Sequence, residues 1–151
     1  MKRLLCIVLG IAFLVGVAQA QDRGTPEEAK AMLKKAVAYV KDAGREKAIA
    51  EFNNPKGKFI YKDLYILIHR TDGVLLALPY TPQGIGHNLI SLKDADGNQH
   101  VKNLVDMAKT KKRGTHEYRW SNPKTKKVDK KTTYYEVVDD MIIQCGYYSG
   151  N

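Results

Sequence analysis

The final third of the chain, residues 116–148, limits the fold more than any other segment. Aromatic and β-branched residues fill three short runs there, and such runs are typical of strands. Turn-forming residues separate the runs, because Asn122-Pro123 follows the first and Asp139-Asp140 follows the second. The segment therefore predicts three consecutive antiparallel strands, at residues 116–120, 131–138 and 141–148.

Two helices are predicted near the start of the chain. Thr25 is suited to cap a helix, Pro26 suits its first position, and Glu28 completes a capping box. The apolar residues that follow have the spacing of one helix face: Ala29, Met32, Leu33, Ala36, Val37 and Val40. Gly44 ends this helix, and residues 45–52 form a second, shorter one.

The middle of the chain changes from strands to a loop and then to a helix. Residues 64–68 and 74–78 are expected to pair as strands, because the turn signal Asp72-Gly73 lies between them. Residues 79–86 contain two prolines and two glycines, which predict a loop. A helix follows at residues 101–108, and Gly114 closes it. This order predicts an α+β fold: an antiparallel sheet with a long N-terminal helix and with the helices packed on one side.

Residues 1–20 have the pattern of a signal peptide. Lys2 and Arg3 precede an apolar run that ends in the small-residue cleavage signal Ala18-Gln19-Ala20. A retained membrane anchor is the alternative, but the run is shorter than the roughly 20 residues that span a bilayer. We expect cleavage, a single domain at residues 21–151 and no remaining membrane span. The protein would then be periplasmic or secreted.

The chain is basic, with a formal net charge of +9 from 25 Lys and Arg against 16 Asp and Glu. Loss of Lys2 and Arg3 leaves 23 against 16, or +7. A secretion signal argues against nucleic acid as the partner of this charge. Residues 109–113 and 124–131 hold much of the excess, and a solvated helix end and hairpin tip are the plainest interpretation. Cys145 alone remains after cleavage, so no internal disulfide is expected.

No catalytic motif is recognisable. The four histidines lie in different predicted elements, and the chain lacks a P-loop, a dinucleotide fingerprint and a serine elbow. Asp94, Asp96 and Gly97 resemble the start of a calcium loop, but the later glutamate that such a loop needs is missing. We therefore expect no enzyme activity, no metal site and no cofactor.

A small-molecule pocket is the better candidate for function, since such pockets combine aromatic walls with a few polar groups. Tyr118 and Trp120 project to one face of their predicted strand, and Lys131 and Thr133 share a face of the next. If the two faces coincide, they form an aromatic box around one ammonium group, which suits a small carboxylate. Ordinary core packing is the alternative for the two aromatic residues, and a solvent-facing position is the alternative for Lys131.

Several short motifs, in their order and spacing, resemble the single Cache domain family of the second type. They are a strand with Tyr65, Asp72-Gly73-Val74, Leu78-Pro79, Gly86-His87-Asn88-Leu89, Lys93-Asp94-Ala95-Asp96-Gly97, and the block from Tyr118-Arg119-Trp120 to Tyr148. Cache domains are PAS-like, extracytoplasmic sensor modules of chemoreceptors and sensor kinases. The resemblance implies this fold, and we expect a sensor module without its own transmitter.

The resemblance also implies a ligand, a small organic acid or similar metabolite, and a loop after the hairpin that helps to close its pocket. It carries five ligand-binding positions over to this chain: Tyr65, Tyr118, Trp120, Lys131 and Tyr134. Two positions depart from the family pattern. Leu78 stands where many relatives have a histidine before the proline, which removes a polar group, and Lys130 stands where relatives often have a proline.

Two functions remain open at this stage. The first is an extracytoplasmic module that binds a small organic carboxylate and acts through a partner, such as a membrane sensor protein. The second is a secreted accessory protein that uses the Cache fold as a scaffold. In that case the basic hairpin at residues 124–131 would contact an acidic partner.

Overall fold

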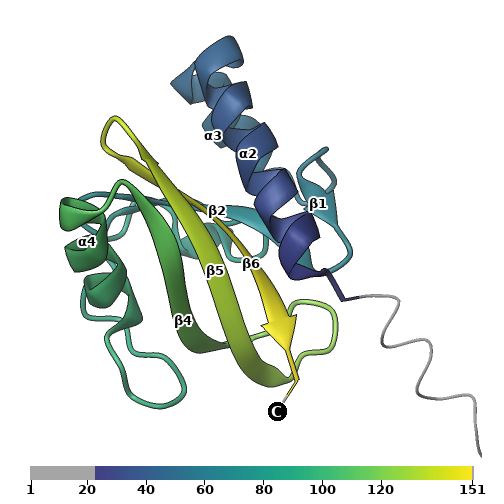
Figure 1. Ribbon diagram of the computed structural model, residues 1–151, viewed down its shortest axis with the longest axis vertical. Helices are drawn as coiled ribbons and strands as arrows, with labels where there is room; N and C mark the ends of the chain where they lie inside the picture. Colours follow the sequence, from purple (N-terminus) through teal and green to yellow (C-terminus); the bar gives the residue numbers. More distant parts are fainter. Residues whose placement is uncertain (1–22, 151) are drawn as a thin grey trace, which may run out of the picture.

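The structure is a computed structural model that describes residues 23–150 (Figure 1). The labels used below are those of the figure, in which the first helix is α2. The elements are α2 (Pro26–Ala43), α3 (Arg45–Phe52), β1 (Ile60–Tyr61), β2 (Leu64–Arg70), β3 (Leu75–Ala77), a 3-10 turn (Pro82–Gly84), α4 (His100–Thr110), β4 (Arg113–Ser121), β5 (Val128–Val138) and β6 (Met141–Ser149).

The strands form one antiparallel sheet in the order β1-β2-β6-β5-β4, with β3 paired to β2. The predicted three-strand meander is confirmed as β4, β5 and β6. Its two hairpins are in continuous register, from Arg113 opposite Glu136 in one and from Val138 opposite Met141 in the other. Asp139 has a φ of 53°, which closes the tight turn between β5 and β6.

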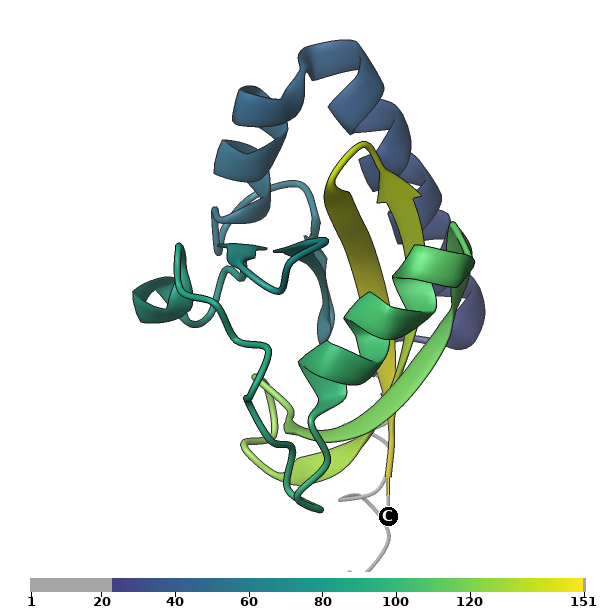
Figure 2. The same ribbon diagram turned by 90° about the vertical axis from the view of Figure 1, so that its left-hand side faces the viewer.

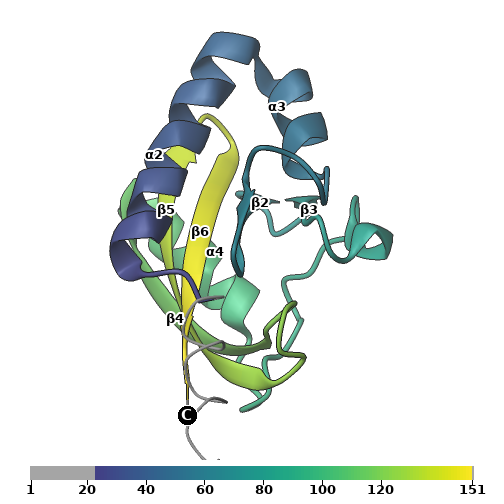
Figure 3. The same ribbon diagram turned by 90° about the vertical axis from the view of Figure 1, so that its right-hand side faces the viewer.

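Helices cover both faces of this sheet. Side chains alternate along a strand. Ile66 and Ile68 therefore pack in the core with α2 and α3, whereas Tyr65 and Leu67 lie in a separate cluster on the other face. Helix α4 packs on that second face, against Ile142. Figures 2 and 3 view the molecule from opposite sides, with α4 in front of the sheet in one and α2 in front in the other.

The predicted α+β fold is confirmed, and the first two helices begin and end where their sequence signals place them. Thr25 accepts a hydrogen bond from the Glu28 amide, and the Glu28 side chain accepts one from the Thr25 amide. The six apolar residues of the predicted stripe are the buried residues of α2. Because cap and stripe are local patterns, they specify this helix without tertiary information.

Three details differ from the expectation. The one-sided packing of helices holds for α2 and α3, but α4 lies on the opposite face. Gly114 does not end α4, which stops at Thr110, but lies within β4, where its missing side chain leaves room for the Tyr135 ring. The two-residue strand β1 was not predicted, because two residues are too few to show a strand pattern.

The predicted signal peptide lies outside the described residues. Across residues 23–150, no helix combines the length and the apolar character needed to cross a bilayer.

Candidate ligand pocket

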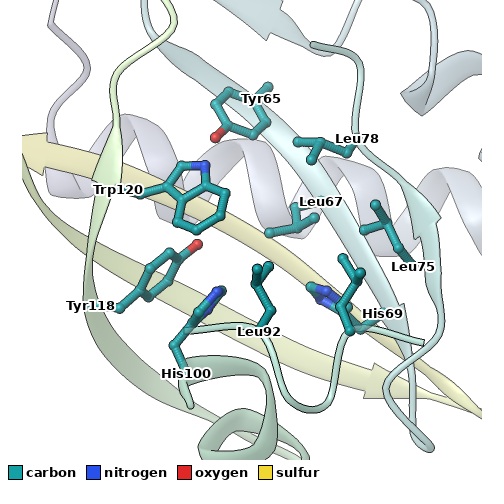
Figure 4. A pocket seen from close by; sticks show the side chains of 10 residues that line it. Tyr65, Leu67, His69, Leu75, Leu78, Leu92, His100, Tyr118 and Trp120 are labelled. Carbon is teal, nitrogen blue, oxygen red and sulfur yellow. The ribbon is translucent and has the colours of Figure 1, made fainter. Parts of the chain in front are cut away.

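A small enclosed pocket lies on the α4 face of the sheet, between β2, β4 and the segment that joins β3 to α4 (Figure 4). Its lining residues are Tyr65, Leu67, His69, Leu75, Leu78, Leu89, Leu92, His100, Tyr118 and Trp120. The cavity volume is ≈ 20 Å³, which is room for about one water molecule. The pocket is therefore closed around its own side chains and must open to admit an organic molecule.

Lys131 lies directly behind this pocket. It is opposite Tyr118 on β4 and Tyr148 on β6, and it is only 1% exposed. Its Nζ donates a hydrogen bond to the hydroxyl of Tyr65 at 2.7 Å, and the same atom lies 4.0 Å from the Tyr65 ring centroid. The solvent-facing alternative for Lys131 is thus excluded, since the ammonium is enclosed by aromatic rings.

The tyrosine hydroxyls form a directed chain from this ammonium. The Tyr148 hydroxyl donates to the carbonyl oxygen of Ser121 at 3.1 Å, and it lies 3.0 Å from the Tyr65 hydroxyl. Because the Tyr148 hydroxyl proton is donated to Ser121, Tyr148 can only accept a hydrogen bond from Tyr65. The Tyr65 hydroxyl therefore donates to Tyr148 and accepts from Lys131. The chain orients both phenols and fixes the position of Tyr65 at the pocket wall.

Burial sets the electrostatics of the site. Desolvation lowers the pKa of Lys131 to about 7, and no ion pair joins its ammonium to a carboxylate among residues 23–150. Desolvation likewise raises the pKa of Tyr118 to about 12 and raises that of Tyr65 further, so both phenols stay protonated. The pocket wall consequently combines a cation with neutral phenols, and no carboxylate lines it among residues 23–150.

Two histidines complete the polar part of the wall. The His100 ring stacks on Tyr118 at a centroid distance of 4.4 Å and lies 5.2 Å from the ring of Trp120. His69 lies further along β2, and its Nδ1 is 3.0 Å from Nε2 of Gln144. Burial lowers the pKa of His100 to about 4 and of His69 to about 3, so both rings are neutral at physiological pH.

Of the five residues predicted to bind ligand, the structure brings four together. Tyr65, Tyr118 and Trp120 line the pocket, and Lys131 contacts the hydroxyl of Tyr65. Tyr134 does not join them, because it projects to the opposite face of β5, where Lys30 of α2 lies 5.0 Å from its ring centroid.

Sequence reasoning missed Tyr148, His69 and His100. Tyr148 ends the final strand motif, and its pairing with Lys131 depends on the β5–β6 register. His69 and His100 come from separate elements, and no spacing rule links them. The spacing of four residues from Tyr65, which puts both side chains on one face of an extended strand, was the one available signal for His69. Within residues 23–150, no cluster of three or more His, Cys, Asp or Glu side chains is arranged to hold a metal ion.

A PAS-like sheet with an enclosed aromatic pocket on one face defines a small-molecule sensor domain. The chain belongs to the family described as Single Cache domain 2, whose model matches residues 6–150. Domains of this family are extracytoplasmic ligand-binding modules of signal transduction proteins, and the family and its structural neighbours are sensory rather than enzymatic.

Similar structures come from chemotaxis proteins. A methyl-accepting chemotaxis protein of Vibrio parahaemolyticus has a TM-score of 0.70 at 22% identity, over 81% of this chain and 86% of that one. A Cache chemosensory domain solved as a structural basis for carboxylic acid recognition has a TM-score of 0.63 at 24% identity, with the same coverage. The periplasmic sensor domain of a chemotaxis protein has a TM-score of 0.63 at 18% identity, over 91% and 99%.

A curated relative is the sensor histidine kinase MctS of Rhizobium johnstonii, which is 31% identical over 78 residues. The match covers 52% of this chain and 17% of the kinase. The chain therefore spans a small part of that relative.

Proposed function

We propose that the domain at residues 21–151 is a periplasmic or secreted sensor module that binds a small organic carboxylate and acts through a partner protein. Lys131 supplies the positive charge, and the Tyr65 hydroxyl holds the ammonium in place at the carboxylate end of the pocket. A membrane sensor protein is the kind of partner that the family membership favours. The comparison with a carboxylic-acid-binding Cache domain supports the ligand class, by analogy of fold.

The observation that carries this proposal is the burial of Lys131 without a carboxylate partner among residues 23–150. A buried ammonium is costly unless an anion or several hydrogen bonds compensate it. Tyr65 gives it one hydrogen bond, and aromatic faces give it weaker attraction. Buried Asp63 attracts the ammonium only from beyond ion-pair distance, so a bound carboxylate would supply the direct partner that Lys131 lacks.

The closed pocket and simple affinity limits favour acids larger than acetate. The best very small ligands gain about 1.5 kcal/mol per heavy atom. Acetate, with four heavy atoms, would then reach only ~6 kcal/mol, or tens of micromolar. A six-atom acid would reach ~9 kcal/mol, which leaves free energy to open the pocket.

Thermal unfolding of residues 21–151 against a panel of small carboxylates, amino acids and amines tests the proposal. A carboxylate at a hundred times its Kd adds about 2.7 kcal/mol and raises Tm by several degrees. Lys131→Met should abolish this shift. Lys130→Met is the matched control, because Lys130 is exposed and pairs with Glu117 at 2.9 Å on the surface.

The proposal fails if Lys131→Met binds carboxylates as tightly as the parent protein, or if no carboxylate shifts Tm in the parent. Calorimetric titration with the same acids separates true absence of binding from a weak thermal effect.

The scaffold function keeps one specific observation in its favour. At the β4–β5 turn, Lys124, Lys126 and Lys127 are all exposed, whereas Lys131 is buried and contributes nothing to this surface. Salt-sensitive association with an acidic partner, lost on charge reversal of these three lysines, would support this function. Carboxylate binding that survives the same reversal would show that the pocket works independently of the hairpin.

A further inference from the structure

The pocket has a second polar end that Lys131 does not explain. His69 and His100 line the cavity and are 3% and 5% exposed. The Nε2 atom of each ring has no hydrogen-bond partner among residues 23–150. Buried polar atoms without a partner are uncommon in folded proteins, and each costs free energy as long as it stays unpaired.

The hydrogen bonds of His69 settle which of its nitrogens carries the proton. Nε2 of Gln144 lies 3.0 Å from His69 Nδ1 and 3.4 Å from the carbonyl oxygen of Ile142. A carbonyl oxygen only accepts, so the Gln144 group there is the amide NH₂, and it also donates to Nδ1. In the neutral ring the proton then resides on Nε2. His69, which lines the pocket, thus carries a buried N–H donor with no acceptor among residues 23–150.

The two polar ends of the pocket are separated along β2. Tyr65 and His69 lie on one face of the strand with Leu67 between them, and four strand residues span about 13 Å. Figure 4 shows Tyr65 at one end of the lining and His69 at the other, with Leu67 between them and with Leu92 between His69 and His100. A two-carbon acid held near Lys131 cannot touch both ends, but a longer acid can.

We propose that His69 forms a second recognition end, which binds an uncharged oxygen of the ligand remote from its carboxylate. The ligand class is a monocarboxylate of four or five carbons with a carbonyl or hydroxyl oxygen at its third or fourth carbon. This inference rests on the proposed carboxylate function and refines it. A second carboxylate is disfavoured, because the residues between the two ends are leucines and the lining contains no Lys or Arg.

Calorimetry with matched pairs of acids tests this inference on the parent protein. The pairs are pentanoate with 4-oxopentanoate and butanoate with 3-hydroxybutanoate, with 2-hydroxybutanoate as the positional control and succinate as the dicarboxylate control. We expect the remotely oxygenated member of each pair to bind about tenfold tighter, since it pairs a buried donor that the alkanoate leaves unpaired. The two controls should lack this advantage.

Substitution of a histidine tests whether its side chain causes the tighter binding of the oxygenated acids. His69→Leu should bring the two Kd values of each pair within about twofold of one another and leave alkanoate binding intact. His116→Leu is the matched control, because His116 is also buried with an unpartnered Nε2 but does not line the pocket. If His69→Leu does not fold, His69→Phe and the Kd ratios of the parent protein decide.

Equal Kd values within each pair in the parent protein would overturn the second recognition end and leave the carboxylate function standing. Absence of binding by every acid would overturn both. An oxygen-dependent advantage that persists in both His69→Leu and His69→Phe would show that other groups recognise the oxygen.

Discussion

The absence of a side chain at Gly146 leaves the space that the buried Lys131 side chain occupies. It lies on β6 next to the lysine stem, and a Cβ atom built there would be 2.8 Å from Cε of Lys131 and 2.4 Å from Oγ1 of Thr133. Real Cβ atoms do not approach other atoms so closely, so even an alanine must displace the lysine or the strand. A single missing methyl group thus makes room for the only buried ammonium of residues 23–150.

Gly146→Ala should lower the free energy of unfolding by about 1–3 kcal/mol and should weaken carboxylate binding, because the lysine leaves its place beside Tyr65. Gly150→Ala is the control, since a Cβ there meets only Arg23 at 3.8 Å. Urea unfolding and calorimetry measure the two effects. Unchanged stability in Gly146→Ala would contradict the packing described for Lys131.

The depressed pKa of Lys131 predicts a pH dependence of stability. Its folded value of about 7 lies below its ordinary value of 10.5, so the unfolded chain binds the extra proton between these limits. Stability of the parent protein therefore rises with pH above about 7, by up to ~1.4 kcal/mol per unit from this group. Lys131→Met should be more stable than the parent at pH 6, by about 1–4 kcal/mol, and this advantage should shrink toward pH 8.5.

Urea unfolding of both proteins at pH 6, 7.5 and 8.5 checks this prediction. Higher pH is avoided, because burial raises the pKa of Cys145 from 9 to about 12 and so lowers stability as pH rises above 9. A difference between the two proteins that stays constant with pH would mean that Lys131 keeps its charge throughout.

At the scale of elements, Asn53 connects the end of α3 to β3 and the start of the segment over the pocket. Its amide nitrogen donates to the carbonyl oxygen of Leu76 at 3.0 Å, and its oxygen accepts from the Leu78 amide at 2.9 Å. Beyond Leu78, the described backbone hydrogen bonds of residues 79–85 join only positions within residues 78–87. Asn53 therefore anchors the near end of the part of the wall best placed to move.

Asn53→Ala should lower the free energy of unfolding by about 1–3 kcal/mol, because it leaves the Leu76 carbonyl and the Leu78 amide without their partner. Asn53→Asp keeps the acceptor for the Leu78 amide and should lose less stability. Denaturant midpoints rank the stabilities of the parent and the two variants. Equal midpoints for parent and Asn53→Ala would show that water replaces both bonds at no cost.

The same scale explains how much the sequence could predict. Helices α2 and α3 were predicted to their ends, because caps, glycine and apolar spacing lie within each segment. The meander was predicted from its turns, yet its pairing was not, and pairing is what brings Tyr148 beside Lys131. Tyr134 was placed wrongly relative to Lys131, since residues three apart on a regular strand face opposite ways. His100 joined the pocket through the packing of α4, which no local pattern encodes.

For the whole molecule, the positive charge and the pocket are separate features. The formal net charge is +9, and exposed parts of it lie at residues 109–113 and at the β4–β5 turn, whereas Lys131 is enclosed. Exposed charges are screened beyond about 8 Å at physiological salt, and buried ones much less. The salt dependence of binding therefore distinguishes the exposed β4–β5 turn from the pocket beside Lys131.

Raising sodium chloride from about 0.05 to 0.5 M should change the Kd of the best carboxylate by less than about threefold. Association of the exposed hairpin with any acidic partner should weaken far more over the same range. Calorimetry at both salt concentrations measures the first effect. A steep loss of carboxylate affinity would place the binding charge on the surface and away from Lys131.

The small volume of the cavity, ≈ 20 Å³, also affects the rate at which a ligand can bind. If the wall must part before an acid can enter, the observed association rate rises with acid concentration and then levels off at the opening rate. Trp120 is the one tryptophan of the chain and lines the cavity, so stopped-flow fluorescence would follow this directly. A module built in this way would fill no faster than its wall opens, however steep the rise in acid, so a pulse much shorter than the opening time would fill only a small fraction of the pockets.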